Sequence, residues 1–127
     1  MRQIINTGLP EGKSPVELAG IANGILYVCS IPSLADGIIE PGGIEAQTEQ
    51  TLRNLKQSVE AAGATMDDVI QVQVFLTDHA HFSGMNAVYA KFFNKPYPVR
   101  ATFITGLIVP GAIIEVLAQA DVTKVQR

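Results

Sequence analysis

Two apolar runs with a turn between them lie near the start of the chain. Residues 18–22 and residues 25–30 are mostly apolar, and Asn23-Gly24 separates them. An Asn-Gly pair in this position predicts a β-hairpin, because both residues accept a positive φ. The Gly- and Pro-rich segment 32–43 that follows predicts a loop.

Apolar residues then recur at helical spacing in two segments. Residues 44–62 predict a helix whose apolar stripe consists of Leu52, Leu55, Val59 and Ala62. Gly63 comes directly after this stripe, at a position where glycine commonly ends a helix. Residues 81–93 predict a second helix, with an apolar side made of Phe82, Met85, Tyr89, Phe92 and Phe93.

Three further segments have the pattern of β-strands. In residues 68–77 every second position is apolar, namely Ile70, Val72, Val74 and Leu76, and this is the period of a strand. Residues 99–108 and residues 113–122 are apolar runs of strand length, divided by a Pro-Gly pair. The order of strands, helix, strand, helix and strands predicts an α+β fold with two helices on one face of a single sheet. Residues 1–127 are predicted to form one domain.

Several of these strands are apolar on both sides, whereas two helices cover only one face of a sheet. A single chain would therefore expose an apolar sheet face to water. Large exposed apolar patches usually mark contact surfaces. We expect the chain to form a closed homo-oligomer, although a small sheet face can also be tolerated in water.

The composition indicates which classes of molecule the protein can bind. The 127 residues are 47% apolar and 17% charged, and the formal net charge is −3. This composition suits a chain with a substantial core. Nucleic-acid backbones are bound by clustered Lys and Arg, whereas the nine basic residues here are scattered singly. We therefore expect no nucleic-acid partner.

The cysteine count and the N-terminal sequence indicate a compartment. The lone Cys29 has no intramolecular disulfide partner, which favours a reducing environment. The first ten residues contain no apolar signal-peptide core. The uncharged stretch 18–35 includes turn-forming residues, so it is expected to form buried strands and not a membrane span. We expect a cytoplasmic protein with no membrane partner.

Two isolated charges lie in the apolar second half of the chain. Arg100 is the only basic residue in segment 96–123, and Glu115 is the only acidic residue in segment 79–120. A buried unpaired charge is costly, so each needs a partner. They form a structural ion pair, or they belong to a small-molecule site. In such a site Arg100 binds a carboxylate through its two-pronged guanidinium, and Glu115 handles a proton or a water.

A hairpin closed by Pro110-Gly111 argues against a direct ion pair. In that hairpin Arg100 and Glu115 would share one sheet face but stand about 20 Å apart along it. Either the two strands are not hairpin partners, or the charges meet other groups, for example across a subunit boundary.

Three stretches of sequence carry a resemblance to a known family. They are EAQTEQTLRNLKQSVEAAGATMDDVIQVQVFLTD, FSGMNAVYAKFF, and PVRATF followed by IIEVLAQA. In order and spacing, over nearly the whole chain, they resemble the RidA (YjgF) family of reactive-intermediate deaminases. The third stretch is similar to the family's Pro-x-Arg signature, which a strand Glu follows about 15 residues later.

The resemblance implies a fold, an assembly and a chemistry. The fold is the compact trimeric chorismate mutase-like type: one mixed sheet, two helices on one face, and the last strand inserted within the sheet. The assembly is a homotrimer with clefts between subunits that bind a small carboxylate substrate. The chemistry is hydrolysis of reactive 2-enamine and 2-imine acids to 2-oxo acids and ammonia, with no metal or organic cofactor.

The resemblance also implies roles for individual residues. Arg100 would bind the substrate carboxylate, and Glu115 would orient or activate the attacking water. Thr102 stands where the family often has a cysteine, and its hydroxyl can hydrogen-bond a ligand. Backbone groups near Cys29 and Ser30 would line the cleft.

One further position matches the family and two depart from it. Asn86 matches a family asparagine and is expected to organise the adjoining loop. Val16 stands where the archetypal deaminases carry a tyrosine, and Val28-Cys29 stand where they carry Ser-Gly. These departures remove polar or small groups from the cleft wall. Two alternatives therefore stay open: a non-catalytic protein that binds or senses a small carboxylate such as a 2-oxo acid, and the nuclease or translation-inhibitor role attributed to some relatives.

The Asp-His-Ala-His sequence at residues 78–81 has the His-x-His spacing of some metal sites. It lies between a predicted strand and a predicted helix, with no further ligand nearby in the sequence. A solvated loop or helix cap is the favoured interpretation, and no metal site is predicted.

Overall fold

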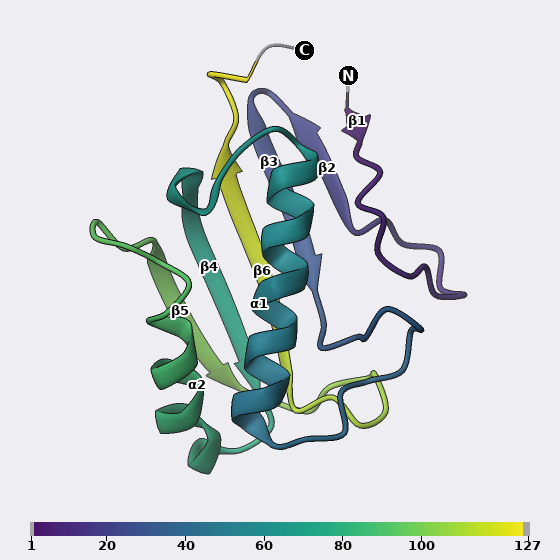
Figure 1. Cartoon of the computed structure of the whole chain (residues 1–127), viewed down its shortest axis with the longest axis vertical. Coiled ribbons are helices and arrows are strands. Elements are labelled where there is room, and N and C mark those ends of the chain that lie inside the picture. The colour runs from purple at the N-terminus through teal and green to yellow at the C-terminus, as the bar shows by residue number, and fades with distance from the viewer. Residues whose placement is uncertain (1, 126–127) are drawn as a thin grey trace.

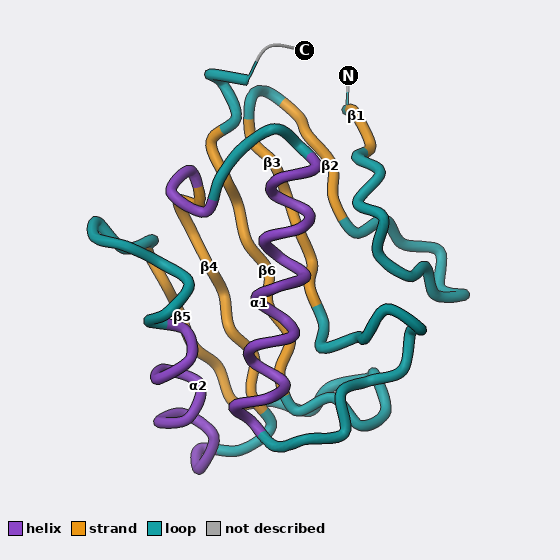
Figure 2. The backbone as a smooth tube through the Cα atoms, viewed as in Figure 1, coloured by secondary structure: helices purple, strands orange, loops and turns teal. Residues whose placement is uncertain are grey.

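The chain folds into one six-stranded sheet with two helices on one side, as seen in a computed structural model that describes residues 2–125 (Figure 1). The strands are β1 (Gln3–Ile4), β2 (Ala19–Ala22), β3 (Ile25–Ser30), β4 (Val69–Leu76), β5 (Val99–Ile104) and β6 (Ile114–Asp121), and the helices are α1 (Ile44–Ala61) and α2 (Phe82–Tyr89). Figure 2 shows both helices in front of the strands. The predicted α+β fold with two helices on one face is confirmed.

The strand order is β1-β2-β3-β6-β4-β5. The pair β4–β5 is parallel and the other pairs are antiparallel, so the sheet is mixed. The last strand lies between β3 and β4, as the resemblance implied. Of the two alternatives left open for residues 99–108 and 113–122, the first is confirmed: β5 and β6 are not hairpin partners, because β4 lies between them.

The local predictions for the first hairpin and for α1 are confirmed. Asn23 and Gly24 have φ values of 52° and 75°, and they connect β2 to β3 in the register Ala22↔Ile25. Gly63 has a φ of 85°. Its amide donates to the Glu60 carbonyl, which satisfies a carbonyl at the end of α1. The predicted apolar stripe of α1 is buried.

The second helix is shorter than predicted. It ends at Tyr89, and the amides of Lys91 and Phe92 bond to carbonyls three residues back. This tighter pattern turns the chain out of the α-helix. Phe93 still packs against Tyr89, with ring centroids 4.6 Å apart, so the apolar side continues past the helix end.

Strand β4 departs from strict alternation at its start. The register with β6 shifts between Val69 and Gln71, and Ile70 is 54% exposed. The shift is a β-bulge, in which one residue lies outside the ladder. Val72, Val74 and Leu76 are buried as predicted.

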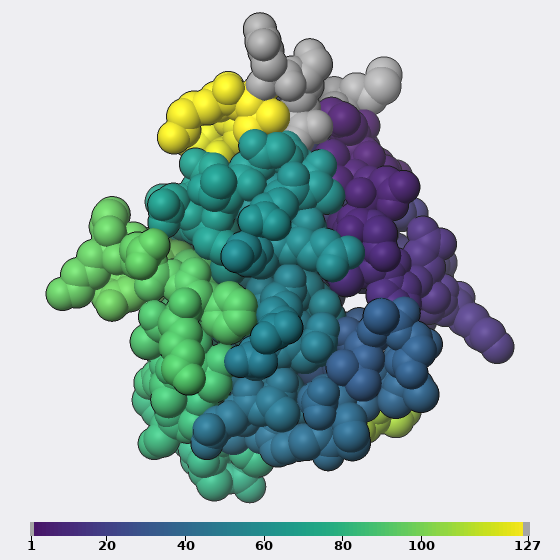
Figure 3. All heavy atoms as spheres, viewed as in Figure 1, coloured from purple at the N-terminus to yellow at the C-terminus, as the bar shows by residue number. Residues whose placement is uncertain are grey.

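The core lies between the sheet and the helices. Its largest fully buried side chains come from β3, β4, β6, α1 and α2 and include Leu26, Leu52, Leu55, Leu76, Met85 and Ile114. The space-filling view of this side shows the helices and flanking segments covering the sheet (Figure 3). Neither helix in the described part of the chain has the length and hydropathy that a bilayer crossing needs.

One buried amide on α1 fixes the start of β6. The Gln47 side-chain nitrogen donates to the Glu40 carbonyl at 2.9 Å and to the Gly111 carbonyl at 2.8 Å. Its oxygen accepts from the Ile113 amide at 2.8 Å. These bonds join two loops to the helix, and Glu115 follows two residues after Ile113.

Candidate functional site

Arg100 lies on the helix-bearing side of the sheet. It is in the edge strand β5, opposite the fully buried Val72 of β4. Its guanidinium carbon lies 4.6 Å from the Tyr89 ring centroid and 5.8 Å from the Phe82 centroid. One terminal nitrogen contacts the Met85 sulfur at 3.9 Å. Aromatic faces and a thioether therefore surround the charged group.

Thr102 and Asn86 lie on the same side of the molecule as Arg100. Thr102 follows two residues later in β5, opposite Val74, and is half-buried. Asn86 is half-buried in α2, directly after Met85. The fold thus places the predicted residues Arg100, Thr102 and Asn86 in β5 and α2.

Glu115 and Cys29 meet on the opposite face of the sheet. Glu115 pairs with Phe75 in the ladder, while Cys29 pairs with Leu117. The Cys29 thiol donates to a Glu115 carboxylate oxygen at 3.6 Å. Burial and the neighbouring Glu115 charge raise the pKa of Cys29 from 9.0 to about 12. The thiol is therefore protonated at neutral pH and is no nucleophile, since the thiolate is the reactive form.

Ser30 points away from this face. Its hydroxyl is buried and donates to the Thr51 carbonyl of α1 at 2.7 Å. Its side chain thus belongs to the helix–sheet layer. The side chain therefore does not reach the open face, and the role that the resemblance implied for backbone groups near Ser30 stays a prediction.

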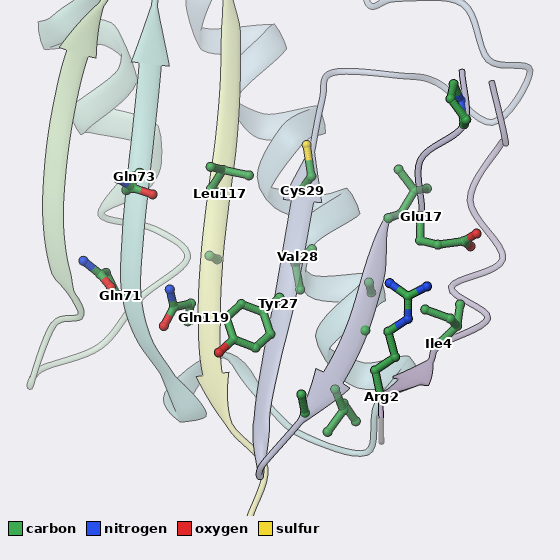
Figure 4. A pocket seen from close by; sticks show the side chains of 17 residues that line it. Arg2, Ile4, Glu17, Tyr27, Val28, Cys29, Gln71, Gln73, Leu117 and Gln119 are labelled. Atoms are coloured by element: carbon green, nitrogen blue, oxygen red, sulfur yellow. The ribbon is translucent and has the colours of Figure 1, made fainter. Parts of the chain in front are cut away.

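A broad hollow of about 580 Å³ lies on the face without helices. Figure 4 looks onto this face and labels residues that line it from β1, β3, β4, β6 and the N-terminal segment. The labelled lining residues include Arg2, Glu17, Tyr27, Cys29, Gln71, Gln73, Leu117 and Gln119. Tyr27 is 49% exposed and Leu117 is 39% exposed. The sheet face predicted to lack helices is therefore uncovered in the single chain, and its lining mixes apolar side chains with glutamines.

Sequence reasoning missed two sets of residues around these sites. Phe82, Met85 and Tyr89 were assigned to a core stripe, yet they also contact Arg100; their i, i+3, i+7 spacing was the available signal. Gln71 and Gln73 were recognised as polar residues that alternate with apolar ones in β4, but their position in a hollow was not predicted.

The His-x-His segment caps a turn. The Asp78 carboxylate accepts a hydrogen bond from the Ala80 amide at 2.8 Å, and His79–His81 form a short 3-10 helix. The helix-cap interpretation is confirmed. Within residues 2–125 no three His, Cys, Asp or Glu side chains are grouped so that they could hold a metal ion.

The geometry places two isolated charged groups on opposite faces of the sheet. One offers a cation whose donors meet no carboxylate in residues 2–125. The other offers a carboxylate beside a protonated thiol. A free guanidinium suits a planar anion, and a carboxylate can accept a proton from water.

Comparison with known proteins agrees with this fold. The family model for endoribonuclease L-PSP matches residues 15–122. The Rid-family protein YyfA from Yersinia pestis is 31% identical with a TM-score of 0.90, over 96% of this chain and 100% of that one. RidA from an Antarctic Psychrobacter is 26% identical with a TM-score of 0.87, over 94% and 98% of the two chains.

A third structure carries a ligand. E. coli TdcF with bound serine is 28% identical with a TM-score of 0.85, over 94% of this chain and 98% of that one. The family match covers far more than half of the chain. The chain therefore belongs to the RidA (YjgF) family, the family of the endoribonuclease L-PSP model.

Proposed function

We propose that this protein hydrolyses reactive 2-enamine and 2-imine acids to 2-oxo acids and ammonia, as a homotrimer with its sites between subunits. Arg100 binds the substrate carboxylate and Glu115 orients the attacking water. Thr102, Asn86 and the backbone near Cys29 and Ser30 complete the cleft. No metal or organic cofactor takes part in the proposed reaction.

The observation that carries the proposal is the state of Arg100. Its guanidinium is held against aromatic rings and makes no salt bridge within residues 2–125. Arginine forms two parallel hydrogen bonds with a carboxylate, and these are stronger than neutral ones. A serine ligand, as named for TdcF, carries such a carboxylate.

The placement of Glu115 supports a site that is shared between two chains. In one chain Arg100 and Glu115 point to opposite faces, so they do not serve one ligand together. The edge position of β5 leaves Arg100 at the rim of the chain. A second copy that lies against the open sheet face brings its Arg100 to the Glu115 of the first. The same contact covers the exposed apolar side chains of that face.

The proposed reaction adds water across the C=N bond of the imine. The water oxygen bonds to C2 of the substrate, and Glu115 accepts the water proton and passes it to the nitrogen. The C2 hydroxyl proton then passes through Glu115 to the amino nitrogen, the C2–O double bond forms, and the C2–N bond breaks with its electron pair going to nitrogen. Ammonia departs and the 2-oxo acid remains bound to Arg100 through its carboxylate. The protonated Cys29 beside Glu115 takes no covalent part.

A coupled assay tests this function. A threonine dehydratase generates 2-iminobutyrate in place, and semicarbazide competes to trap it. The wild type is expected to suppress trapping, whereas Arg100→Ala is expected to behave like buffer. Arg100→Ala that retains full turnover would show the assignment to be wrong.

One observation favours a second function, binding or sensing of a small carboxylate without turnover. Val16, in place of a tyrosine, is 69% exposed and offers no hydroxyl to the chemistry. Calorimetry with 2-oxobutyrate separates the two functions. Binding with no suppression of semicarbazide trapping indicates the second function, and binding with suppression indicates the deaminase.

A further inference from the structure

The apolar stripe of α2 does more than fill the core, because it supports the one charged group of β5. Phe82, Met85 and Tyr89 all contact the Arg100 guanidinium. From this arrangement we infer that Tyr89 is a positioning residue. Its ring holds the Arg100 guanidinium flat, so that the N–H edge of the group is presented to a carboxylate. The inference rests on the carboxylate-binding role proposed for Arg100.

The distances identify Tyr89 as the main support. The guanidinium carbon lies 4.6 Å from the Tyr89 centroid, well within the roughly 6 Å range of a cation–π contact. The Phe82 centroid, at 5.8 Å, lies near the limit of that range. The Met85 sulfur accepts only weakly. A guanidinium that covers a ring with its face keeps its N–H donors directed outward, in its own plane.

Tyr89 is itself held in place. Its side chain is 7% exposed, and its ring packs against Phe93 with centroids 4.6 Å apart and planes inclined by 33°. Phe82, by contrast, is 43% exposed. A buried ring with a fixed neighbour gives Arg100 a rigid surface, so less ordering is needed when a ligand binds.

Tyr89 supports the charge of Arg100 without neutralising it. Burial raises the pKa of Tyr89, although the charge of Arg100 and its N–H groups near the hydroxyl act in the opposite direction, so the phenol is neutral at physiological pH. The Tyr89 hydroxyl is buried and has no hydrogen-bond partner within residues 2–125. A neutral phenol forms no ion pair with Arg100, so Arg100 keeps a full charge for its ligand. The Tyr89→Phe variant separates the contribution of the ring from that of the hydroxyl.

Two substitutions at Tyr89 and one matched control test the inference by calorimetry. The titrant is 2-oxobutyrate. Tyr89→Phe keeps the ring and is expected to bind within about twofold of wild type. Tyr89→Leu is expected to bind about tenfold more weakly, as expected for loss of a desolvated cation–π contact. Val88→Ala removes a buried side chain from the same helix that makes none of the contacts to Arg100, and it is expected to lower the melting temperature with affinity within about twofold.

The comparison between variants decides the result. The inference would be overturned by a folded Tyr89→Leu variant that binds 2-oxobutyrate as tightly as wild type. An equal loss of affinity in Val88→Ala would also overturn it, because the effect would then come from general loosening of α2.

A second measurement needs no ligand and separates this inference from the proposed function. In the NMR spectrum of the free protein, the Arg100 Hε resonance is expected to be shifted upfield by the Tyr89 ring. The shift should persist in Tyr89→Phe and disappear in Tyr89→Leu. If wild type binds no carboxylate but this pattern is seen, the proposed function fails and the positioning of Arg100 by Tyr89 stands. An Hε resonance that is the same in wild type and Tyr89→Leu shows that the ring does not position the guanidinium.

Discussion

Arg100 and Glu115 leave the same sheet on opposite faces. Arg100 is level with Val72 of β4, and Glu115 is level with Phe75 of the same strand. Val72 and Phe75 are three positions apart in β4. Because side chains alternate faces along a strand, they point to opposite sides of the sheet. The two charges therefore form no intramolecular ion pair, and each is available to a ligand or to another chain.

Replacement of Arg100 by lysine should weaken carboxylate binding even though the charge is kept. Lysine lacks the planar fork and the flat face that rests on Tyr89. Loss of a charge-assisted bidentate contact corresponds to about 10- to 100-fold in affinity. Calorimetry with 2-oxobutyrate measures this effect, with Arg53→Lys as the control on the exposed side of α1. Equal affinity in Arg100→Lys and wild type would contradict bidentate binding.

Glu115→Gln should separate turnover from binding. The amide is nearly isosteric with the carboxylate but accepts no proton from water, so imine hydrolysis is expected to fall about 10²- to 10⁴-fold. Affinity for 2-oxobutyrate should change little, because Arg100 binds the carboxylate. The semicarbazide competition assay and calorimetry measure the two quantities. Wild-type turnover in Glu115→Gln would remove Glu115 from the reaction.

Cys29 should resist alkylation in the folded protein. Burial and Glu115 raise its pKa to about 12, so the thiolate fraction at pH 8 is very small. Iodoacetamide labelling at pH 8, followed by mass spectrometry, should be at least about tenfold slower than for the urea-unfolded chain. Glu115→Gln should restore part of the reactivity, since Glu115 is a smaller cause than burial. Rapid labelling of the folded wild type would contradict the raised pKa.

The same pKa predicts how stability depends on pH. From pH 9 to 12 the unfolded chain loses the Cys29 proton and the folded chain retains it, so the unfolded state binds fewer protons. The free energy of unfolding therefore falls as pH rises through this window. Cys29→Ala should show a shallower fall in urea unfolding across the same range. Parallel pH profiles for the two proteins would contradict the prediction.

A charge on the open sheet face should prevent assembly. Leu117 is partly exposed at the centre of that face, in β6, and an arginine there would be buried without a partner in an oligomer. Light scattering should give a three-chain mass for wild type and a one-chain mass for Leu117→Arg. Ala61→Arg, on the exposed side of α1, should keep the wild-type mass. A three-chain mass for Leu117→Arg would show that this face is not the contact.

Gln47→Ala should destabilise the fold more than loss of an exposed glutamine on the same helix. It leaves two carbonyls and one amide without the partners that Gln47 supplies, at a cost of about 2–4 kcal/mol in the free energy of unfolding. Gln57 makes one bond, to the Thr7 carbonyl, and Gln57→Ala should cost about 1 kcal/mol. Urea unfolding at one protein concentration compares them. Equal losses would show that Gln47 is no special anchor.

Local sequence was sufficient to predict most of the helices, strands and turns. The Asn23-Gly24 turn, the stripe of α1 and the glycine after it followed from backbone preferences and side-chain period, and these depend on near neighbours alone. The end of α2 and the bulge at Ile70 did not follow. Both depend on how the surrounding chain packs, and the residues there are apolar enough to suit either arrangement.

The sequence by itself determined that Arg100 and Glu115 are isolated charges in apolar strands and that one sheet face is left without helices. Only the tertiary structure decided which face each charge occupies. In β5 the odd-numbered and the even-numbered positions both include apolar residues. The local pattern therefore does not determine which of the two sets faces the helices. The choice comes from the pairing of β4 with β5 and with β6, and pairing between strands distant in sequence depends on the packing of the whole core.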